Sequence, residues 1–100
     1  YLQSLGPEQV TFVITGGERN MEDLACAEYL ELLLRGKSPN PAPFLKRVLE
    51  SEDAQYHLDP KRVGFPYEDL DFCTRVSAFS FAMPVFREQG RFVMRPVRVD

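Results

Sequence analysis

The sequence has no tryptophan, one histidine and two cysteines among its 100 residues. No CxxC pair is present, so a zinc site has almost no ligands to use. No apolar run reaches the roughly 18 residues that a membrane-spanning helix needs, and we expect no membrane partner. An excess of basic residues is also missing, because the net charge is −3 and the pI about 5.2. We therefore expect no nucleic-acid partner.

The scarcity of cysteine bears on the redox compartment. Cys26 and Cys73 both lie in helical patterns beside apolar residues. This placement favours two buried, reduced thiols in a cytoplasmic protein, and a disulfide is the alternative.

The length predicts a single domain over residues 1–100, large enough to bury one core. The segment Tyr1 to Pro7 does not begin with Met and reads as a chain entered partway along. We therefore expect the C-terminal part of a longer protein.

Apolar patterning predicts a strand followed by a helix in the first third of the chain. The run "QVTFVIT", residues 9–15, is apolar on both faces and ends at two glycines, which is typical of a strand covered on both sides. Residues 24–34 have a helical composition and a wide apolar arc. Asn20 is the expected N-cap of this helix and Gly36 its C-cap.

The remaining pattern predicts further helices and then a hairpin. Residues 44–51 form the second helix, residues 51–58 are an uncertain third with Ser51 as its cap, and "PYEDLDF" starts another. Leu70, Phe72, Cys73 and Val76 supply the buried side of that last helix. Two β-like runs then flank "REQGR", which predicts a hairpin. The expected class is α/β, a sheet flanked by helices in three α/β/α layers with a C-terminal β-hairpin.

The junction between the first strand and helix carries an unusual density of charge. Three interpretations remain open for Gly16 to Asp23. The acids can simply favour the positive end of the helix, behind an N-cap. Glycine N–H groups and Arg19 can bind an anion. The acids Glu18, Glu22 and Asp23 can supply hard oxygen ligands for Mg²⁺.

Other polar residues have bland explanations alongside functional ones. His57 beside Asp59 suits a surface loop better than catalysis, and the acids of "YEDLDF" suit a solvated helix start better than a second metal cluster. The arginines of the C-terminal runs suit charged edge strands as well as anion binding.

The junction and the C-terminal segment together resemble the C-terminal part of the 2-phosphosulfolactate phosphatase family. The first element of that pattern is Gly17, Glu18 and Arg19, and the second is "EDL" at residues 22–24 with Ala27. The matches in the last element are Asp69 or Asp71, Cys73, Phe81, Pro84 and Val85.

The sequence departs from this family pattern in two places. The spacer between Arg19 and Glu22 is shorter than in many members, and Glu28 stands where the family usually has Gly. The family's N-terminal half, with its two threonine-rich segments, has no counterpart here. The resemblance therefore implies the missing N-terminal half of the same protein as a partner, and an inactive fragment on its own.

The resemblance implies a cytoplasmic, Mg²⁺-dependent phosphatase acting on a small phosphorylated 2-hydroxy acid, as in coenzyme M biosynthesis. Glu18 and Asp23 would be catalytic acids, and Glu22 and Asp23 would hold the metal. Arg19, with the backbone of Gly16 and Gly17, would bind the substrate.

Two alternatives from other functional classes stay open. A non-catalytic interaction or oligomerisation module, including a homo-oligomer, would use the apolar helix Leu24 to Leu34 and the hairpin Phe81 to Val97. A small-anion-sensing domain would use the same charged junction without turnover.

Overall fold

The computed structural model of the protein describes residues 1–17 and 21–99. The chain divides into two compact units, one of residues Gln9–Val76 and one of Tyr1–Glu8 together with Ser77–Asp100. Among the described residues, no helix has the length and apolar character needed to cross a bilayer.

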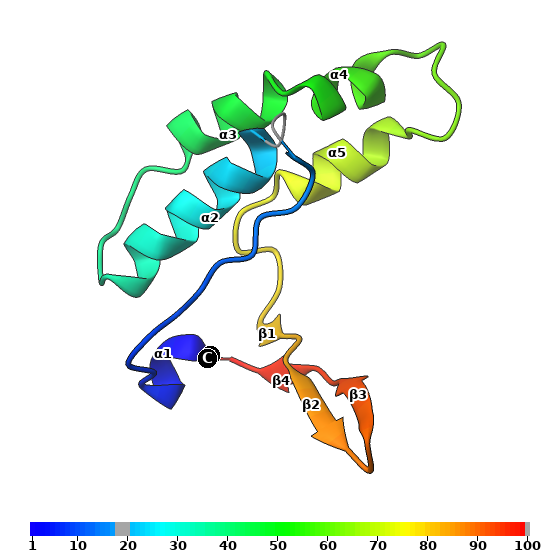
Figure 1. The fold of residues 1–100 in the computed structure, drawn as a ribbon. Coiled ribbons are helices and arrows are strands. Elements are labelled where there is room, and N and C mark those ends of the chain that lie inside the picture. The colour runs from blue at the N-terminus through cyan, green and yellow to red at the C-terminus, as the bar shows by residue number, and fades with distance from the viewer. Residues whose placement is uncertain (18–20, 100) are drawn as a thin grey trace. The chain divides into compact units, whose positions relative to one another are not determined.

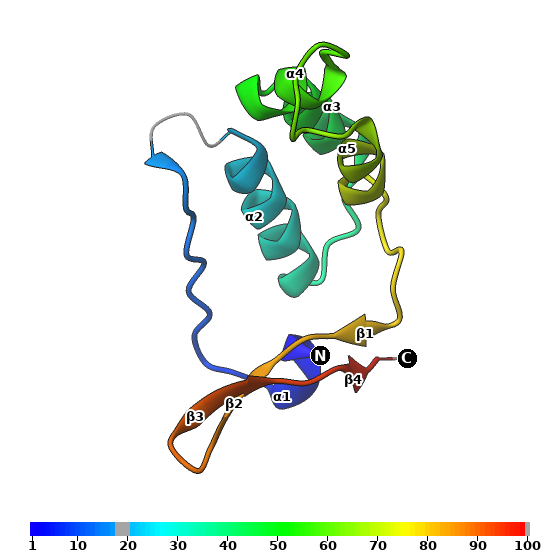
Figure 2. The same cartoon turned by 90° about the vertical axis from the view of Figure 1, so that its right-hand side faces the viewer.

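The first unit is built from four helices. They are α2 (Met21–Leu34), α3 (Ala42–Leu49), α4 (Glu52–Leu58) and α5 (Tyr67–Cys73). Helix α2 packs along α3, and α4 packs against α5 (Figures 1 and 2). The predicted helices are confirmed, including the uncertain one at residues 51–58.

Two predicted capping residues set the limits of α2 and α4. Gly36 has a φ of 72°, and the N–H groups of Gly36 and Lys37 donate to the carbonyls of Leu33 and Leu32 at 3.0 and 2.9 Å. This pattern is a Schellman motif, which glycine favours at the left-handed position. At the start of α4, Ser51 Oγ accepts from the Ala54 N–H at 3.2 Å. The N-cap predicted for α2, Asn20, lies outside the described residues.

Side chains join α2 to α3 by one aromatic and one ionic contact. The rings of Tyr29 and Phe44 meet edge to face, with centroids 5.3 Å apart. The Arg47 guanidinium forms an ion pair with Glu28. These contacts hold α3 against α2.

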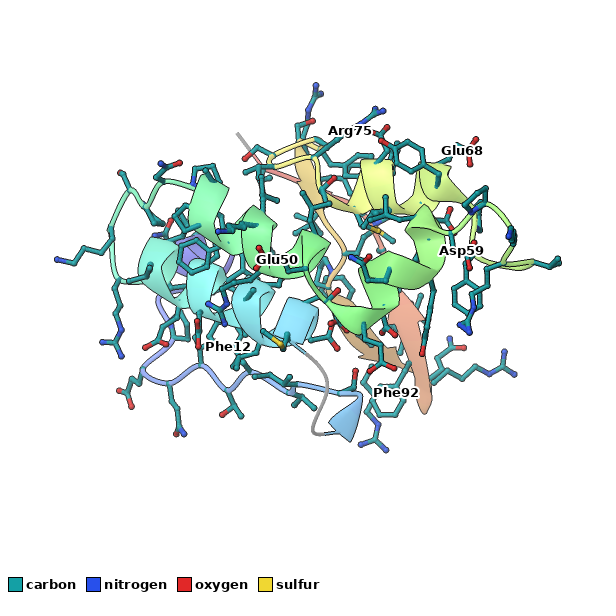
Figure 3. The ribbon with its side chains drawn as sticks, turned by 90° about the horizontal axis from the view of Figure 1, so that it is seen from above. Phe12, Glu50, Asp59, Glu68, Arg75 and Phe92 are labelled. Carbon is teal, nitrogen blue, oxygen red and sulfur yellow. The ribbon has the colours of Figure 1, made fainter. Side chains whose placement is uncertain are left out.

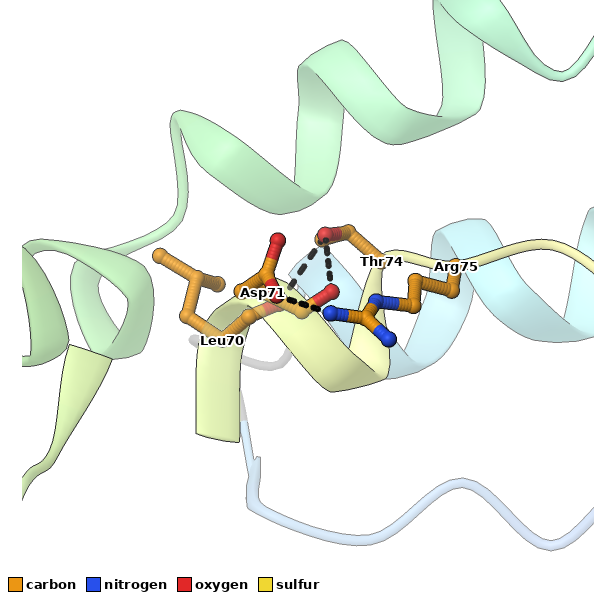
Figure 4. A network of polar contacts seen from close by, with 4 residues as sticks. All are labelled: Leu70, Asp71, Thr74 and Arg75. Atoms are coloured by element: carbon orange, nitrogen blue, oxygen red, sulfur yellow. Dashed lines mark hydrogen bonds and ion pairs between the residues drawn. The ribbon is translucent and has the colours of Figure 1, made fainter. Parts of the chain in front are cut away.

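The end of α5 is closed by a local polar network (Figure 4). Thr74 Oγ1 donates to the carbonyls of Leu70 and Asp71 at 2.9 and 3.2 Å. Arg75 pairs with the Asp71 carboxylate at 2.5 Å. The hydroxyl thus gives the Asp71 carbonyl a partner at the end of the helix and is a second donor to the Leu70 carbonyl, which also accepts from the Thr74 N–H at 3.1 Å.

The buried set of this unit is small. Ala25, Ala54 and Leu70 are its buried apolar residues, and Ser51 is 1% exposed. The predicted burial of Phe72, Cys73 and Val76 is wrong, because all three are exposed. Cys26 is exposed too. Both thiols are free, as predicted, but neither is buried, contrary to the prediction. Within the described part of this unit the helices pack mainly on one another, which covers too little of each surface.

The second unit contains a short helix and two antiparallel strand pairs. Helix α1 spans Leu2–Leu5, and the strands are β1 (Phe81–Ala82), β2 (Val85–Glu88), β3 (Arg91–Met94) and β4 (Val97–Arg98). Strand β1 pairs with β4, and β2 pairs with β3 with Val85 opposite Met94. Gln89 and Gly90 connect β2 to β3 with φ values of 49° and 76°. Two positive φ values in a two-residue connection match the twist of antiparallel strands.

The described residues form no strand at 9–15, contrary to the prediction. This segment is extended beside α2 but joins no strand pair (Figure 2). A strand needs a neighbour for its backbone N–H and C=O groups, and the described residues supply none here. The protein is of mixed α/β class, with helices α2 to α5 in one unit and the paired strands, together with the short helix α1, in the other.

Candidate functional site

The charged junction connects the extended segment to α2. Gly16 and Gly17 have φ values of 95° and 76°, a region that other residues rarely adopt, so the glycines permit a sharp turn here. Thr15 Oγ1 lies 3.4 Å from Asp23 Oδ2. The end of the extended segment therefore faces the first turn of α2.

A cavity of about 460 Å³ opens at this junction. It lies between the start of α2 and the start of α4, two segments about thirty residues apart in the sequence. Its lining residues are Thr15, Gly16, Glu22, Asp23, Glu52, Asp53 and Tyr56. We call it the acidic cavity, because four of these residues carry carboxylates.

The four carboxylates belong to the first turns of two helices. Glu22 and Asp23 stand in the first turn of α2, and Glu52 and Asp53 in the first turn of α4. The positive ends of both helices favour negative charge, which offsets part of the mutual repulsion. The acidic cavity is therefore negatively charged, and the two helix N-termini offset part of that charge.

The surroundings of Glu22 in the acidic cavity favour its protonated form. Loss of solvation raises the pKa of Glu22 above its ordinary value of 4.5, and the charges of Asp53 and Asp23 add to the rise. A backbone hydrogen bond acts in the opposite direction but is outweighed. The Oε2 atom of Glu22 is buried and has no hydrogen-bond partner among the described residues.

An unpartnered carboxylate oxygen among like charges is the donor type that a hard cation binds. Within residues 1–17 and 21–99, however, no three Asp, Glu, His or Cys side chains are arranged to hold a metal ion. Mg²⁺ commonly binds through one or two carboxylates plus waters and substrate oxygens. The acidic cavity fits that incomplete kind of site and not a closed protein cage.

The predicted site residues fall into three groups. Gly16, Glu22 and Asp23 line the acidic cavity together. Gly17 is exposed and is not among its lining residues. Glu18 and Arg19 lie outside the described residues.

Sequence reasoning missed the contribution of α4. Glu52, Asp53 and Tyr56 follow the cap Ser51, and acids in that position already have an explanation as partners of the helix dipole. Tyr56 Oη donates to Glu52 Oε1 at 2.9 Å, which holds both side chains at the cavity wall. Only the packing of α2 on α3 and the turn at Ser51 bring α4 beside α2.

A smaller cavity of about 230 Å³ lies between α2 and the extended segment. Cys26 and Leu30 line it from α2, and Phe12 and Ile14 from the segment; Figure 3 places Phe12 beside the helix. Loss of solvation raises the pKa of the Cys26 thiol, and the charge of Asp23 raises it further. Cys26 is therefore a poor nucleophile at neutral pH.

No protein-family model, curated protein or solved structure matches this chain.

Proposed function

We propose that these residues form the C-terminal part of a Mg²⁺-dependent phosphatase that hydrolyses a phosphorylated 2-hydroxy acid of the 2-phosphosulfolactate type. One observation carries the proposal. Glu22 and Asp23, which match the family pattern, face one cavity with Glu52 and Asp53, and Oε2 of Glu22 is buried without a partner among the described residues.

Glu22 and Asp23 would hold the metal, with waters and substrate oxygens completing its shell. When bound, Mg²⁺ would neutralise negative charge on the phosphoryl group. The four carboxylates of the acidic cavity would otherwise repel a phosphorylated acid, so this substrate class requires a cation in the same cavity.

The turn before α2 would bind the substrate anion. Gly16 lines the acidic cavity, and the positive φ values of Gly16 and Gly17 leave the backbone open to close approach. Arg19, which follows in the sequence, would fork the phosphate or carboxylate. A volume of about 460 Å³ lies within the usual range for small-molecule pockets.

The acids Glu18 and Asp23 would act on the attacking water. One of them orients the water and accepts its proton while the new bond from oxygen to phosphorus forms. The ester bond between phosphorus and the substrate oxygen breaks, and the hydroxy acid leaves. The products are the 2-hydroxy acid and inorganic phosphate.

The proposed function implies the fold expected from the sequence, a three-layer α/β/α sandwich with a C-terminal β-hairpin. Residues 9–15 would then be a strand of a sheet whose other strands come from the missing N-terminal half. Two features support this view: the segment is already extended, and its apolar side chains are uncovered, with Val13 85% exposed. The segment would position the acidic cavity at the edge of that sheet.

Phosphate release from 2-phosphosulfolactate and phospholactate by the complete protein tests the proposal. We expect turnover that depends on Mg²⁺, and a fall in kcat of about a hundredfold or more in Asp23→Asn. Glu50→Gln is the matched control, because Glu50 is an exposed acid at the C-cap of α3, outside the cavity (Figure 3). A folded complete protein that releases no phosphate from either substrate would overturn the proposal.

A non-catalytic interaction module is the second candidate, and exposed apolar side chains favour it. Leu24 and Leu30 of α2 are 39% and 43% exposed, and Phe92 of β3 is 80% exposed. Size-exclusion chromatography of the Glu22→Gln/Asp23→Asn double variant separates the candidates. Lost assembly with unchanged turnover favours the module, and lost turnover with unchanged assembly favours the phosphatase. Anion binding without turnover favours a sensing domain.

A further inference from the structure

A third cavity, of about 380 Å³, lies in the first unit at the turn from α4 to α5. It shares no lining residue with the acidic cavity. Its walls are mainly apolar, from Leu58, Pro60, Phe65, Pro66 and Tyr67. Its polar lining comes from His57, Asp59 and Arg62. We call it the turn cavity.

Arg62 differs from the other described arginines of this unit. Arg35, Arg47 and Arg75 each form an ion pair with a carboxylate on a helix. Among described residues, no hydrogen bond or ion pair engages the Arg62 guanidinium. It lies instead over the ring of Tyr56, with Cζ 3.8 Å from the centroid, and 5.6 Å from that of Phe65. A stacked guanidinium keeps its in-plane N–H groups for an anion.

His57 is held in one orientation at the same turn. Its Nδ1 lies 2.8 Å from the carbonyl oxygen of Pro66, and its ring meets Phe65 edge to face at 5.4 Å. A carbonyl can only accept, so Nδ1 donates this bond and Nε2 is the nitrogen left for a ligand.

The acid in the turn cavity has a structural task. Asp59 Oδ1 accepts from the Lys61 N–H at 3.0 Å, and the Asp59 carbonyl accepts from the Arg62 N–H at 3.1 Å. These bonds close the turn that presents Arg62, and Figure 3 shows Asp59 at the end of α4. Arg62 is therefore the cation of the turn cavity that is left for a ligand.

We propose that the turn cavity binds a small organic anion with an aromatic body, whose carboxylate or phosphate engages Arg62 and whose ring lies against Phe65 and Tyr67. Phe65 and Tyr67 are 37% and 58% exposed, so a ring placed there removes apolar surface from water. The volume of the cavity is within the range of small-molecule pockets. This site is separate from the proposed phosphatase site and does not depend on it.

Titration of the ¹⁵N-labelled protein with phenyl phosphate, benzoate and inorganic phosphate tests the proposal by NMR. We expect amide shifts confined to residues 57–67, saturable with phenyl phosphate or benzoate, and weaker with inorganic phosphate, which has no ring. Comparing the two aromatic ligands tells which anionic group is preferred. Benzylamine, of opposite charge, should give none of these shifts.

Arg62→Gln should weaken binding of the preferred aromatic anion by about tenfold or more, because a charged hydrogen-bond donor is lost. Arg75→Gln is the matched control, since Arg75 also lies over an aromatic ring, Phe72, but is already paired with Asp71. Phe65→Leu, a second variant that keeps an apolar side chain, should weaken the aromatic anions more than inorganic phosphate. Unchanged affinity in Arg62→Gln, or equal binding of benzylamine, would overturn the proposal.

Discussion

The electrostatics of the acidic cavity can be measured through the pKa of Glu22. Its raised pKa means that the folded protein holds the Glu22 proton more tightly than the unfolded chain does. The contribution of Glu22 to stability is therefore most favourable below the ordinary pKa of 4.5 and is lost as the pH rises through the raised value. At neutral pH the full cost of the ionised Glu22 is present.

Glu22→Gln should raise the free energy of unfolding at pH 7 and leave it nearly unchanged below pH 4.5. The gain stays below about 1 kcal/mol, because water reaches and screens this partly exposed side chain. Denaturant titrations across pH measure it. Glu68→Gln, an exposed acid on α5 (Figure 3), is the control and should show no such gain. A loss of stability at pH 7 in Glu22→Gln would contradict the electrostatic account.

Cys26 provides a second test at the residue scale, through its reactivity. Partial loss of solvation and the Asp23 charge raise the pKa of its thiol, so at pH 8 iodoacetamide should modify it more slowly than a small model thiol. Asp23→Asn removes one of these causes and should speed the reaction. Mg²⁺ should speed the reaction in the native protein but not in Asp23→Asn. Equal rates in all these conditions would show that Asp23 does not act on this thiol.

At the scale of the element, α4 depends on one cap. Ser51 is buried, accepts from the Ala54 N–H and donates through Oγ to the Val48 carbonyl at 2.6 Å. Ser51→Ala should lower the free energy of unfolding by about 1–2 kcal/mol, from the lost cap and an unsatisfied N–H. Chemical denaturation measures it, with the exposed Ser38→Ala as the control. A loss of unfolding free energy in Ser51→Ala no larger than that in Ser38→Ala would contradict this role.

The helices could be predicted from the sequence because their signals are local. Ser51 lies three residues before the N–H that it caps, and Gly36 directly follows the turn that it closes. The partners of the acidic cavity are not local. Glu52 and Asp53 meet Glu22 and Asp23 only after α2 packs on α3, and no short sequence window contains that packing.

At the scale of the whole molecule, residues 9–15 explain why the strand prediction failed. Val10, Phe12 and Ile14 give the segment a strand-like pattern, but a strand also needs a neighbour from elsewhere. The helices beside it consequently bury only small residues and one leucine as their apolar core. The apolar pattern of residues 9–15 suits a strand inside a sheet, and the described residues do not supply the neighbouring strands.

Val13→Asp tests whether a longer chain completes that environment. In the 100-residue protein Val13 is 85% exposed, so the change should alter stability by less than about 0.5 kcal/mol. In a longer chain that covers Val13 with a sheet, it should cost about 2 kcal/mol or more. Val63→Asp, in a turn and 94% exposed, is the control. Equal small effects in both proteins would argue against the added sheet.

Tyr56 stands between two cavities, with its hydroxyl on Glu52 and its ring beneath Arg62. The hydrogen bond and charge of Glu52 raise the pKa of its phenol, while Arg62 lowers it. Because no indole absorbs in this protein, the near-ultraviolet spectrum comes mainly from four phenol rings. The Tyr56 phenol is thus an intrinsic chromophore whose ionisation can be followed by its tyrosinate absorption band. A cation bound to Glu52 would move this titration toward lower pH. An anion bound to Arg62 would move it toward higher pH.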